Sequence, residues 1–166
     1  MDPTDDKIKA ECLRLLAGRE HSRKELTQKL APKGFAKEGI EAVLDQLAEE
    51  NWQSDVRYAE SYARSRILKG YGPVFITYEL RQNGIDSAHL PPFDLEALAE
   101  SVAGGWMALL RQVYSRKYGS GPAPNRNEWA KRSRFLQQRG FTSAMIMDLF
   151  AFVRHAETGN GSLPNE

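Results

Sequence analysis

The fold is decided by a stretch of eleven residues that occurs three times: LAPKGFAKEGI at 30–40, LRQNGIDSAHL at 80–90 and LQQRGFTSAMI at 136–146. The three copies share few residues but keep one spacing. A leucine is followed four residues later by glycine, then at once by phenylalanine or isoleucine, and five residues after that by another aliphatic residue. A spacing that recurs three times indicates an internally repeated protein.

This spacing is typical of a tight corner between two helices. In the third copy we expect Gly140 to be the left-handed residue just past a helix end, which places Phe141 and Leu136 at the two positions that touch in a Schellman cap. Phe141 then precedes the next helix and packs against Ile146, as in a hydrophobic staple. We predict that the corner residues are structural: Leu30, Gly34, Phe35, Leu80, Gly84, Ile85, Leu136, Gly140 and Phe141.

Apolar residues recur at helical spacing on both sides of each corner, and no segment has the alternating pattern of a strand. These patterns predict an all-α protein of three tandem three-helix repeats, each similar to a helix-turn-helix unit. The predicted repeats are residues 1–53, 54–103 and 104–155, followed by a disordered tail at 156–166. Pro32 and the Pro91-Pro92 pair interrupt this plan and are expected to disturb helix geometry locally.

Charge is distributed unevenly along a chain whose net charge is only +1. Residues 1–56 carry nine Lys or Arg against twelve Asp or Glu, whereas residues 104–140 carry eight basic residues against Glu128 alone. A positive surface of this kind can meet phosphate groups or an acidic protein face. The alternative is a solvated face whose charge is offset by the acidic first repeat.

The candidate contact residues all come from this basic segment. Some of them are expected to pack along the core instead, because Lys131 and Arg134 lie at helical spacing beside the apolar Phe135 and Leu136. The set predicted to contact a partner is Arg111, Arg116, Lys117, Lys131, Arg132, Arg134 and Arg139.

The sequence offers no catalytic constellation. It lacks the Gly-x-x-x-x-Gly-Lys-Ser/Thr loop that cradles nucleotide phosphates, so we expect no intrinsic ATPase activity. The three histidines, His21, His89 and His155, stand in unrelated segments, and Cys12 lies on the apolar face of the first predicted helix. We therefore predict a protein that is not an enzyme and binds no cofactor and no metal.

Composition indicates the compartment. The chain has no run of eighteen apolar residues, and its acidic N-terminus lacks the apolar segment of a secretory signal. Its single cysteine is compatible with a reducing environment. We expect a cytoplasmic protein with no membrane partner.

Several elements, taken in order, resemble the bacterial RecX family. They are SRKEL at 22–26 with the first corner, DVRYA at 55–59 and KGYGP at 69–73 with the second corner, and RFLQQRGF at 134–141 with the third. The resemblance spans roughly residues 8–154. Each motif is common by itself, and the resemblance lies in their order.

The resemblance implies an elongated, curved molecule and a regulator, generally inhibitory, of the RecA recombinase. Proteins of this family bind the RecA–DNA filament and limit its extension, its ATP hydrolysis and strand exchange. Many also bind single- or double-stranded DNA weakly. By this resemblance the partner of the basic segment is the RecA filament, and we expect the chain to be a monomer.

Two other functions fit the same helical pattern. Residues 22–50 can be interpreted as a helix-turn-helix of a transcription regulator, with 37–50 as its recognition helix. That helix has a net charge of −4, which phosphate would repel. The other alternative is a helical-repeat scaffold that binds a different protein, which composition does not exclude.

Overall fold

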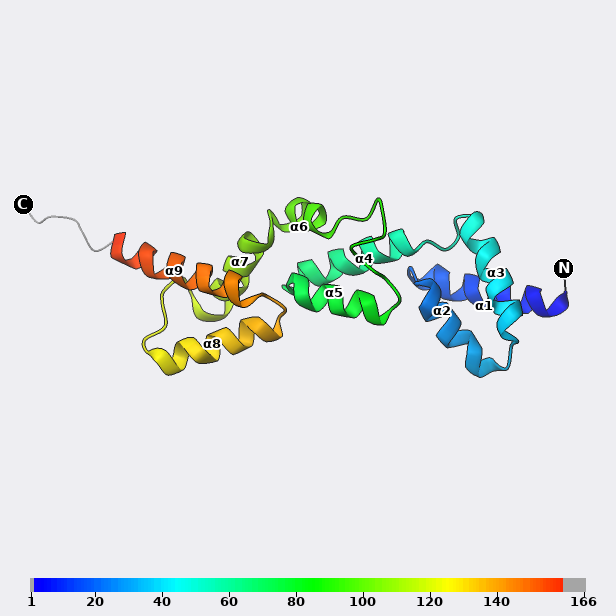
Figure 1. Ribbon diagram of the computed structural model, residues 1–166, viewed down its shortest axis with the longest axis horizontal. Coiled ribbons are helices and arrows are strands. Elements are labelled where there is room, and N and C mark those ends of the chain that lie inside the picture. The colour runs from blue at the N-terminus through cyan, green and yellow to red at the C-terminus, as the bar shows by residue number, and fades with distance from the viewer. Residues whose placement is uncertain (1, 160–166) are drawn as a thin grey trace, which may run out of the picture. The chain divides into compact units, whose positions relative to one another are not determined.

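The computed structural model describes residues 2–159, with side chains up to 157. Within this range every regular element is a helix, which confirms the predicted fold class (Figure 1). The elements, in chain order, are α1 Pro3–Gly18, α2 Arg23–Leu30, the 3₁₀ turn η1 Ala31–Lys33, α3 Lys37–Glu49, α4 Asp55–Leu68, α5 Pro73–Gln82, α6 Leu95–Ala103, α7 Trp106–Tyr118, α8 Arg126–Gln138 and α9 Ser143–Gly159.

Packing divides the chain into two compact units. Unit 1 comprises Met1–Tyr62 and Glu79–Asp94, and unit 2 comprises Ala63–Tyr78 and Leu95–Glu166. The division crosses α4 and α5, so each of these helices contributes to both units. Helix α6 falls within the predicted second repeat, but it packs on α7, which belongs to the predicted third repeat.

The core of unit 1 is formed by the apolar faces of α1, α2 and α3. Its members are almost completely buried: Ile8, Cys12, Leu26, Leu30, Ile40, Val43, Leu44 and Leu47. Burial raises the pKa of the Cys12 thiol to about 11, which disfavours the reactive thiolate at neutral pH and fits the place of this cysteine in the core.

The second and third corners are Schellman caps, as predicted. The Ile85 amide donates to the Leu80 carbonyl (2.9 Å), and the Phe141 amide donates to the Leu136 carbonyl (3.2 Å). These are the bonds that close such a cap and satisfy a helix-terminal carbonyl. All three corner glycines have the expected positive φ: Gly34 (83°), Gly84 (83°) and Gly140 (98°).

The first corner has the left-handed glycine but not the predicted Schellman cap, because no bond joins the Phe35 amide to the Leu30 carbonyl. Helix α2 ends at Leu30 and continues as the 3₁₀ turn Ala31–Lys33, which contains Pro32. The Gly34 amide then donates to the Ala31 carbonyl (3.3 Å). Because proline has no amide hydrogen, it fits the short 3₁₀ turn at a helix end better than it would fit the helix interior.

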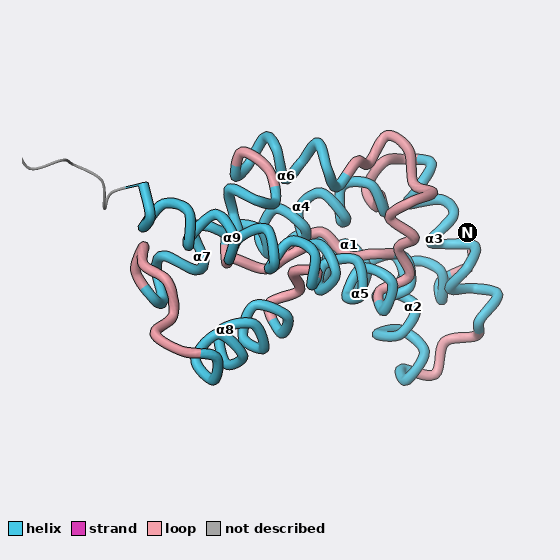
Figure 2. Tube along the Cα trace, turned by 60° about the vertical axis from the view of Figure 1, so that its left-hand side comes forward, coloured by secondary structure: helices cyan, strands magenta, loops and turns pink. Residues whose placement is uncertain are grey.

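The C-terminal boundary corrects the prediction of a tail starting at 156, because α9 continues as a regular helix to Gly159. The remainder of that predicted tail, residues 160–166, lies outside the described residues. Loops join the α-helices (Figure 2). The longer ones are residues 83–94 between α5 and α6 and residues 119–125 between α7 and α8. None of the described helices combines the length and apolar character needed to cross a membrane.

His21 is a buried titratable group in unit 1, only 2% exposed. Its Nε2 lies 3.1 Å from the Lys29 ammonium, which can only donate, so Nε2 accepts and Nδ1 donates to the Arg19 carbonyl (3.0 Å). Burial, with the Arg19 and Lys29 cations, lowers the pKa of His21 below its ordinary value of 6.5, although the Arg19 carbonyl and Glu25 act in the opposite direction.

This arrangement predicts a pH dependence of stability. A pKa lowered by folding means that the unfolded chain binds the proton more readily, so stability is lost as the pH falls below about 6.5. We expect the urea midpoint of unfolding to decrease between pH 7.5 and pH 5.5, and His21→Gln to flatten that decrease. An equal decrease in both proteins would contradict the neutral state of His21.

Candidate functional site

Two turns that are far apart in the sequence meet within unit 2. The Gly72 amide donates to the Arg139 carbonyl (2.7 Å), and the Val74 amide donates to the Gly140 carbonyl (2.9 Å). We call this contact, between residues 70–74 and 139–141, the glycine seam. It joins the turn between α4 and α5 to the corner between α8 and α9.

Glycine is required at both sides of the seam. A Cβ atom on Gly72 would lie 2.6 Å from the Gly140 carbonyl oxygen. A Cβ on Gly140 would lie 2.6 Å from the backbone nitrogen of Phe75 and would overlap the Phe75 Cβ. Because these neighbours are largely main-chain atoms, only a displacement of backbone could make room.

The seam places Arg139 beside Lys69. The Arg139 Nη1 donates to the Lys69 carbonyl (3.3 Å). Its guanidinium also lies 4.7 Å from the centre of the Tyr71 ring and 5.4 Å from that of Phe135. Tyr71 in turn stacks on Phe75 (ring centres 4.3 Å apart). Arg139 is thus held by the fold in a defined place and is half-buried.

Four cations surround a cavity of about 260 Å³ next to the seam. We call it the cationic pocket. Helix α7 contributes Arg116, Lys117 and the apolar Val113, and the Lys117 ammonium lies 3.5 Å from the centre of the Phe135 ring. Its lining residues include no carboxylate: Lys69, Gly70, Val113, Arg116, Lys117, Phe135 and Arg139.

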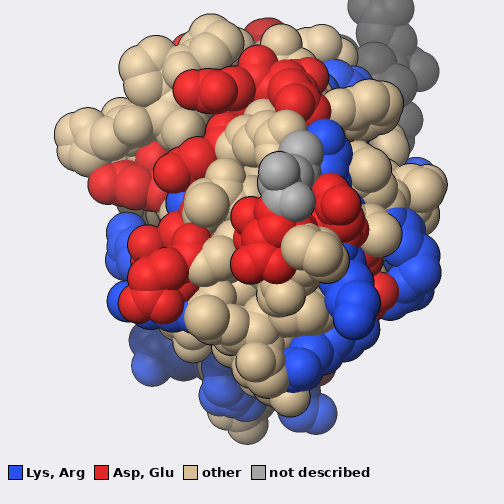
Figure 3. Space-filling view, turned by 90° about the vertical axis from the view of Figure 1, so that its right-hand side faces the viewer, with Lys and Arg blue, Asp and Glu red and all other residues tan. Residues whose placement is uncertain are grey.

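These four cations differ from most cations of unit 1, which have a carboxylate partner. Seven Lys or Arg side chains of unit 1 form ion pairs there: Lys9, Arg14, Arg19, Arg23, Lys33, Lys37 and Arg57. In the view of Figure 3, acidic side chains gather over the upper and central part of the face at the N-terminal end. Among the residues that the structure describes, none of the four cations of the cationic pocket pairs with a carboxylate.

Arg132 has a structural environment. Its side chain is only 11% exposed, and its Nε donates to Glu128 (3.2 Å) while its Nη1 donates to the Tyr114 hydroxyl (2.8 Å). The guanidinium also lies 4.5 Å from the centre of the Tyr118 ring. Arg132 therefore connects α8 to α7 inside the unit and presents little charge to the outside.

The structure brings together three of the seven predicted contact residues, Arg116, Lys117 and Arg139. Lys131 and Arg134 are exposed on α8 but do not line the pocket, and Arg111 lies 4.1 Å from the ring of Phe152 beside another cavity. Sequence reasoning missed Lys69, which lies outside the basic segment. The sequence feature that could have pointed to Lys69 is its position directly before the Gly-Tyr-Gly-Pro turn at 70–73.

The described residues contain no group of three His, Cys, Asp or Glu side chains that could hold a metal ion. The chemical groups of the cationic pocket are its four cations and the apolar side chains of Val113 and Phe135. Such a surface can bind phosphate oxygens through charge-assisted hydrogen bonds and can meet acidic protein side chains.

Comparisons with known proteins identify the family. Family models match three successive parts of the chain: RecX, first three-helix domain, residues 9–47; second three-helix domain, 54–90; and third three-helix domain, 107–150. The regulatory protein RecX of Halorhodospira halophila is 40% identical over 139 residues, covering 84% of this chain and 83% of the relative. That of Pseudomonas entomophila is 41% identical, covering 84% and 86%.

Solved structures agree in fold. The crystal structure of RecX from Lactobacillus salivarius matches with a TM-score of 0.68 at 22% identity, covering 92% of this chain and 97% of that one. A crystal structure of a regulatory protein RecX matches with a TM-score of 0.69 at 24% identity, covering 88% and 71%. Together with the three matched domains, these similarities show that the chain belongs to the RecX family of regulatory proteins.

Proposed function

We propose that this protein regulates the RecA recombinase by binding the RecA–DNA filament, and that it limits filament extension, ATP hydrolysis and strand exchange. Membership of the RecX family supports a regulatory role. The observation that carries the proposal is the cationic pocket, whose four side chains have no carboxylate partner among the described residues. A filament offers both phosphate and protein grooves to such a surface.

The proposed contact surface is centred on Lys69, Arg116, Lys117 and Arg139. The exposed Lys131 and Arg134, with Arg111, form its outer part. Arg132 is left out, because its guanidinium already bonds Glu128 and Tyr114. We also propose that the isolated protein binds single- or double-stranded DNA weakly, because these cations can neutralise several phosphates.

The rest of the proposal follows from the family and from the composition. We propose three functional repeats at residues 1–53, 54–103 and 104–155, a monomer in the cytoplasm, and a role in DNA repair by homologous recombination. The protein acts by binding and has no turnover of its own, so the ATP consumed in its presence is hydrolysed by RecA.

A titration into a RecA ATPase assay on single-stranded DNA tests the proposal. We expect ATP hydrolysis to fall as the protein is added, because bound protein blocks further growth of the filament. A block far below one molecule per RecA subunit would indicate action at filament ends, and a block near one-to-one would indicate binding along the groove. The protein without RecA serves as the control and should release no phosphate.

Two results would contradict this function. Unchanged RecA turnover at a large excess of the protein would remove the regulatory role. Phosphate release by the purified protein alone, persisting through successive purification steps, would show an enzyme rather than a binding protein.

A further inference from the structure

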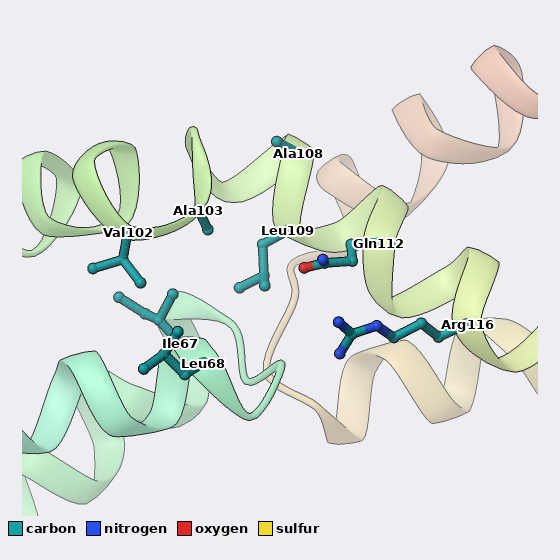
Figure 4. Close-up of a pocket in the computed structure, with 8 residues that line it drawn as sticks. All are labelled: Ile67, Leu68, Val102, Ala103, Ala108, Leu109, Gln112 and Arg116. Atoms are coloured by element: carbon teal, nitrogen blue, oxygen red, sulfur yellow. The ribbon is translucent and has the colours of Figure 1, made fainter.

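A second cavity adjoins the cationic pocket within unit 2. Its volume is about 400 Å³, within the range of ordinary ligand pockets. Figure 4 shows Ile67 and Leu68 of α4 on one side, Val102 and Ala103 of α6 above them, and Leu109 of α7 facing the space between. We call it the apolar pocket, because these five side chains carry no hydrogen-bonding group.

Leu68 is the most unusual member of this lining. It is 66% exposed, although Ile67 beside it is fully buried. A large aliphatic side chain at the mouth of a cavity is stabilised when another apolar group covers it and removes its surface from water. Leu68 therefore favours a partner that brings apolar surface.

The two polar side chains of the lining, Gln112 and Arg116, both come from α7. Figure 4 shows the Arg116 guanidinium and the Gln112 amide extending from α7 toward the cavity. Arg116 lines both pockets, and its guanidinium has no hydrogen bond, ion pair or ring contact with the described residues. A positive charge that has no partner within the fold is complementary to a negative charge on a ligand.

We propose that the apolar pocket receives an aliphatic or aromatic side chain of a protein partner, and that a carboxylate next to that side chain pairs with Arg116. A phosphate would use Arg116 but would leave the exposed Leu68 uncovered, whereas an apolar side chain next to a carboxylate would complement both residues. A buried apolar anchor beside an ion pair at the rim is the usual composition of a protein interface.

This inference deepens the proposed function and rests on it. The two pockets share Arg116 but differ in chemistry, so each addresses a different component of a nucleoprotein filament. The cationic pocket binds the phosphate backbone, and the apolar pocket binds the protein. Disrupting one interaction should therefore leave the other measurable.

The test compares two binding assays on matched variants. One measures binding to a RecA filament assembled on single-stranded DNA with a slowly hydrolysed ATP analogue, and the other measures fluorescence anisotropy of a labelled oligothymidylate alone. Leu68→Asn removes the apolar contact without a change of charge. Met147→Asn is the matched control, because Met147 is 70% exposed, lies on α9 and lines neither pocket.

We expect Leu68→Asn to weaken filament binding about tenfold or more, the loss typical of a central interface residue, and to leave oligothymidylate binding unchanged. Met147→Asn should change neither, and Arg116→Gln should weaken both. Thermal melts of all variants confirm folding, which such exposed positions should tolerate.

Each other outcome contradicts a separate statement. Full filament binding by Leu68→Asn would overturn the apolar pocket as a protein contact and leave the proposed function standing. Equal losses for Leu68→Asn and Met147→Asn would also overturn it, because the effect would not be specific to the pocket. No binding of the unchanged protein to the filament would overturn the proposed function and this inference with it.

Discussion

Replacing Gly140 with alanine is expected to lower the free energy of unfolding by about 3 kcal/mol or more, one of the largest effects of any single substitution in this chain. A positive φ of 98° contributes about 1–2 kcal/mol of that cost. The overlap of the new Cβ with the backbone and Cβ of Phe75 contributes a further cost, about 1–3 kcal/mol for overpacking. Urea denaturation followed by circular dichroism measures the change.

Gly34→Ala is the matched control. Gly34 occupies the same place in the first corner and has a φ of 83°, but a Cβ there would meet nothing within 4 Å. We expect this substitution to cost only the conformational part, about 1–2 kcal/mol. Equal losses at the two positions would show that the glycine seam does not require the close approach seen between Gly140 and Phe75.

Neutralising the cationic pocket is expected to have the largest effect on binding. In the triple variant Lys69→Gln, Arg116→Gln, Lys117→Gln, the affinity for single-stranded DNA should fall by about 10²-fold at low salt. The slope of log K against log salt concentration should shrink by about 0.7 for each phosphate that the variant no longer neutralises. Arg139 stays unchanged, because its side chain also contacts the seam. A salt titration followed by fluorescence anisotropy measures both quantities.

A second triple variant separates position from net charge. Arg126→Gln, Lys131→Gln and Arg134→Gln remove the same number of charges from exposed positions on α8. We expect a smaller loss of affinity, because these residues do not line the pocket. If both triple variants lost affinity equally, the pocket would have no special role, and the surface would act through its total charge.

Local structure in this protein could be predicted well from the sequence. The Schellman bonds at Leu80–Ile85 and Leu136–Phe141 join residues that are close together in the sequence, so the spacing alone carries the information. The capping box between Ser22 and Glu25 is of the same kind, and both of its bonds are 3.1 Å long. Such motifs need no knowledge of tertiary packing.

The functional site could be predicted only in part, because it depends on contacts between distant residues. Nothing local brings Lys69 to Arg139, which is seventy positions further along the chain. Burial also decides which cations remain available. Arg132 and Lys131 are neighbours of the same charge, yet Arg132 turns inward to Tyr114 whereas Lys131 stays exposed. The net charge of residues 104–140 counts Arg132 and Lys131 alike, so it cannot show which of the two is available to a partner.

Because of the glycine seam, the form of the cationic pocket and its affinity for anions depend on different atoms. Main-chain atoms of Gly72, Val74, Arg139 and Gly140 hold the two turns together, so the side chains at 69, 116 and 117 contribute no hydrogen bond to the seam. Such positions can gain or lose a charge in the course of evolution while the cavity keeps its form. Single substitutions at these positions can therefore change the ionic strength at which the protein releases an anionic partner, while the fold stays the same.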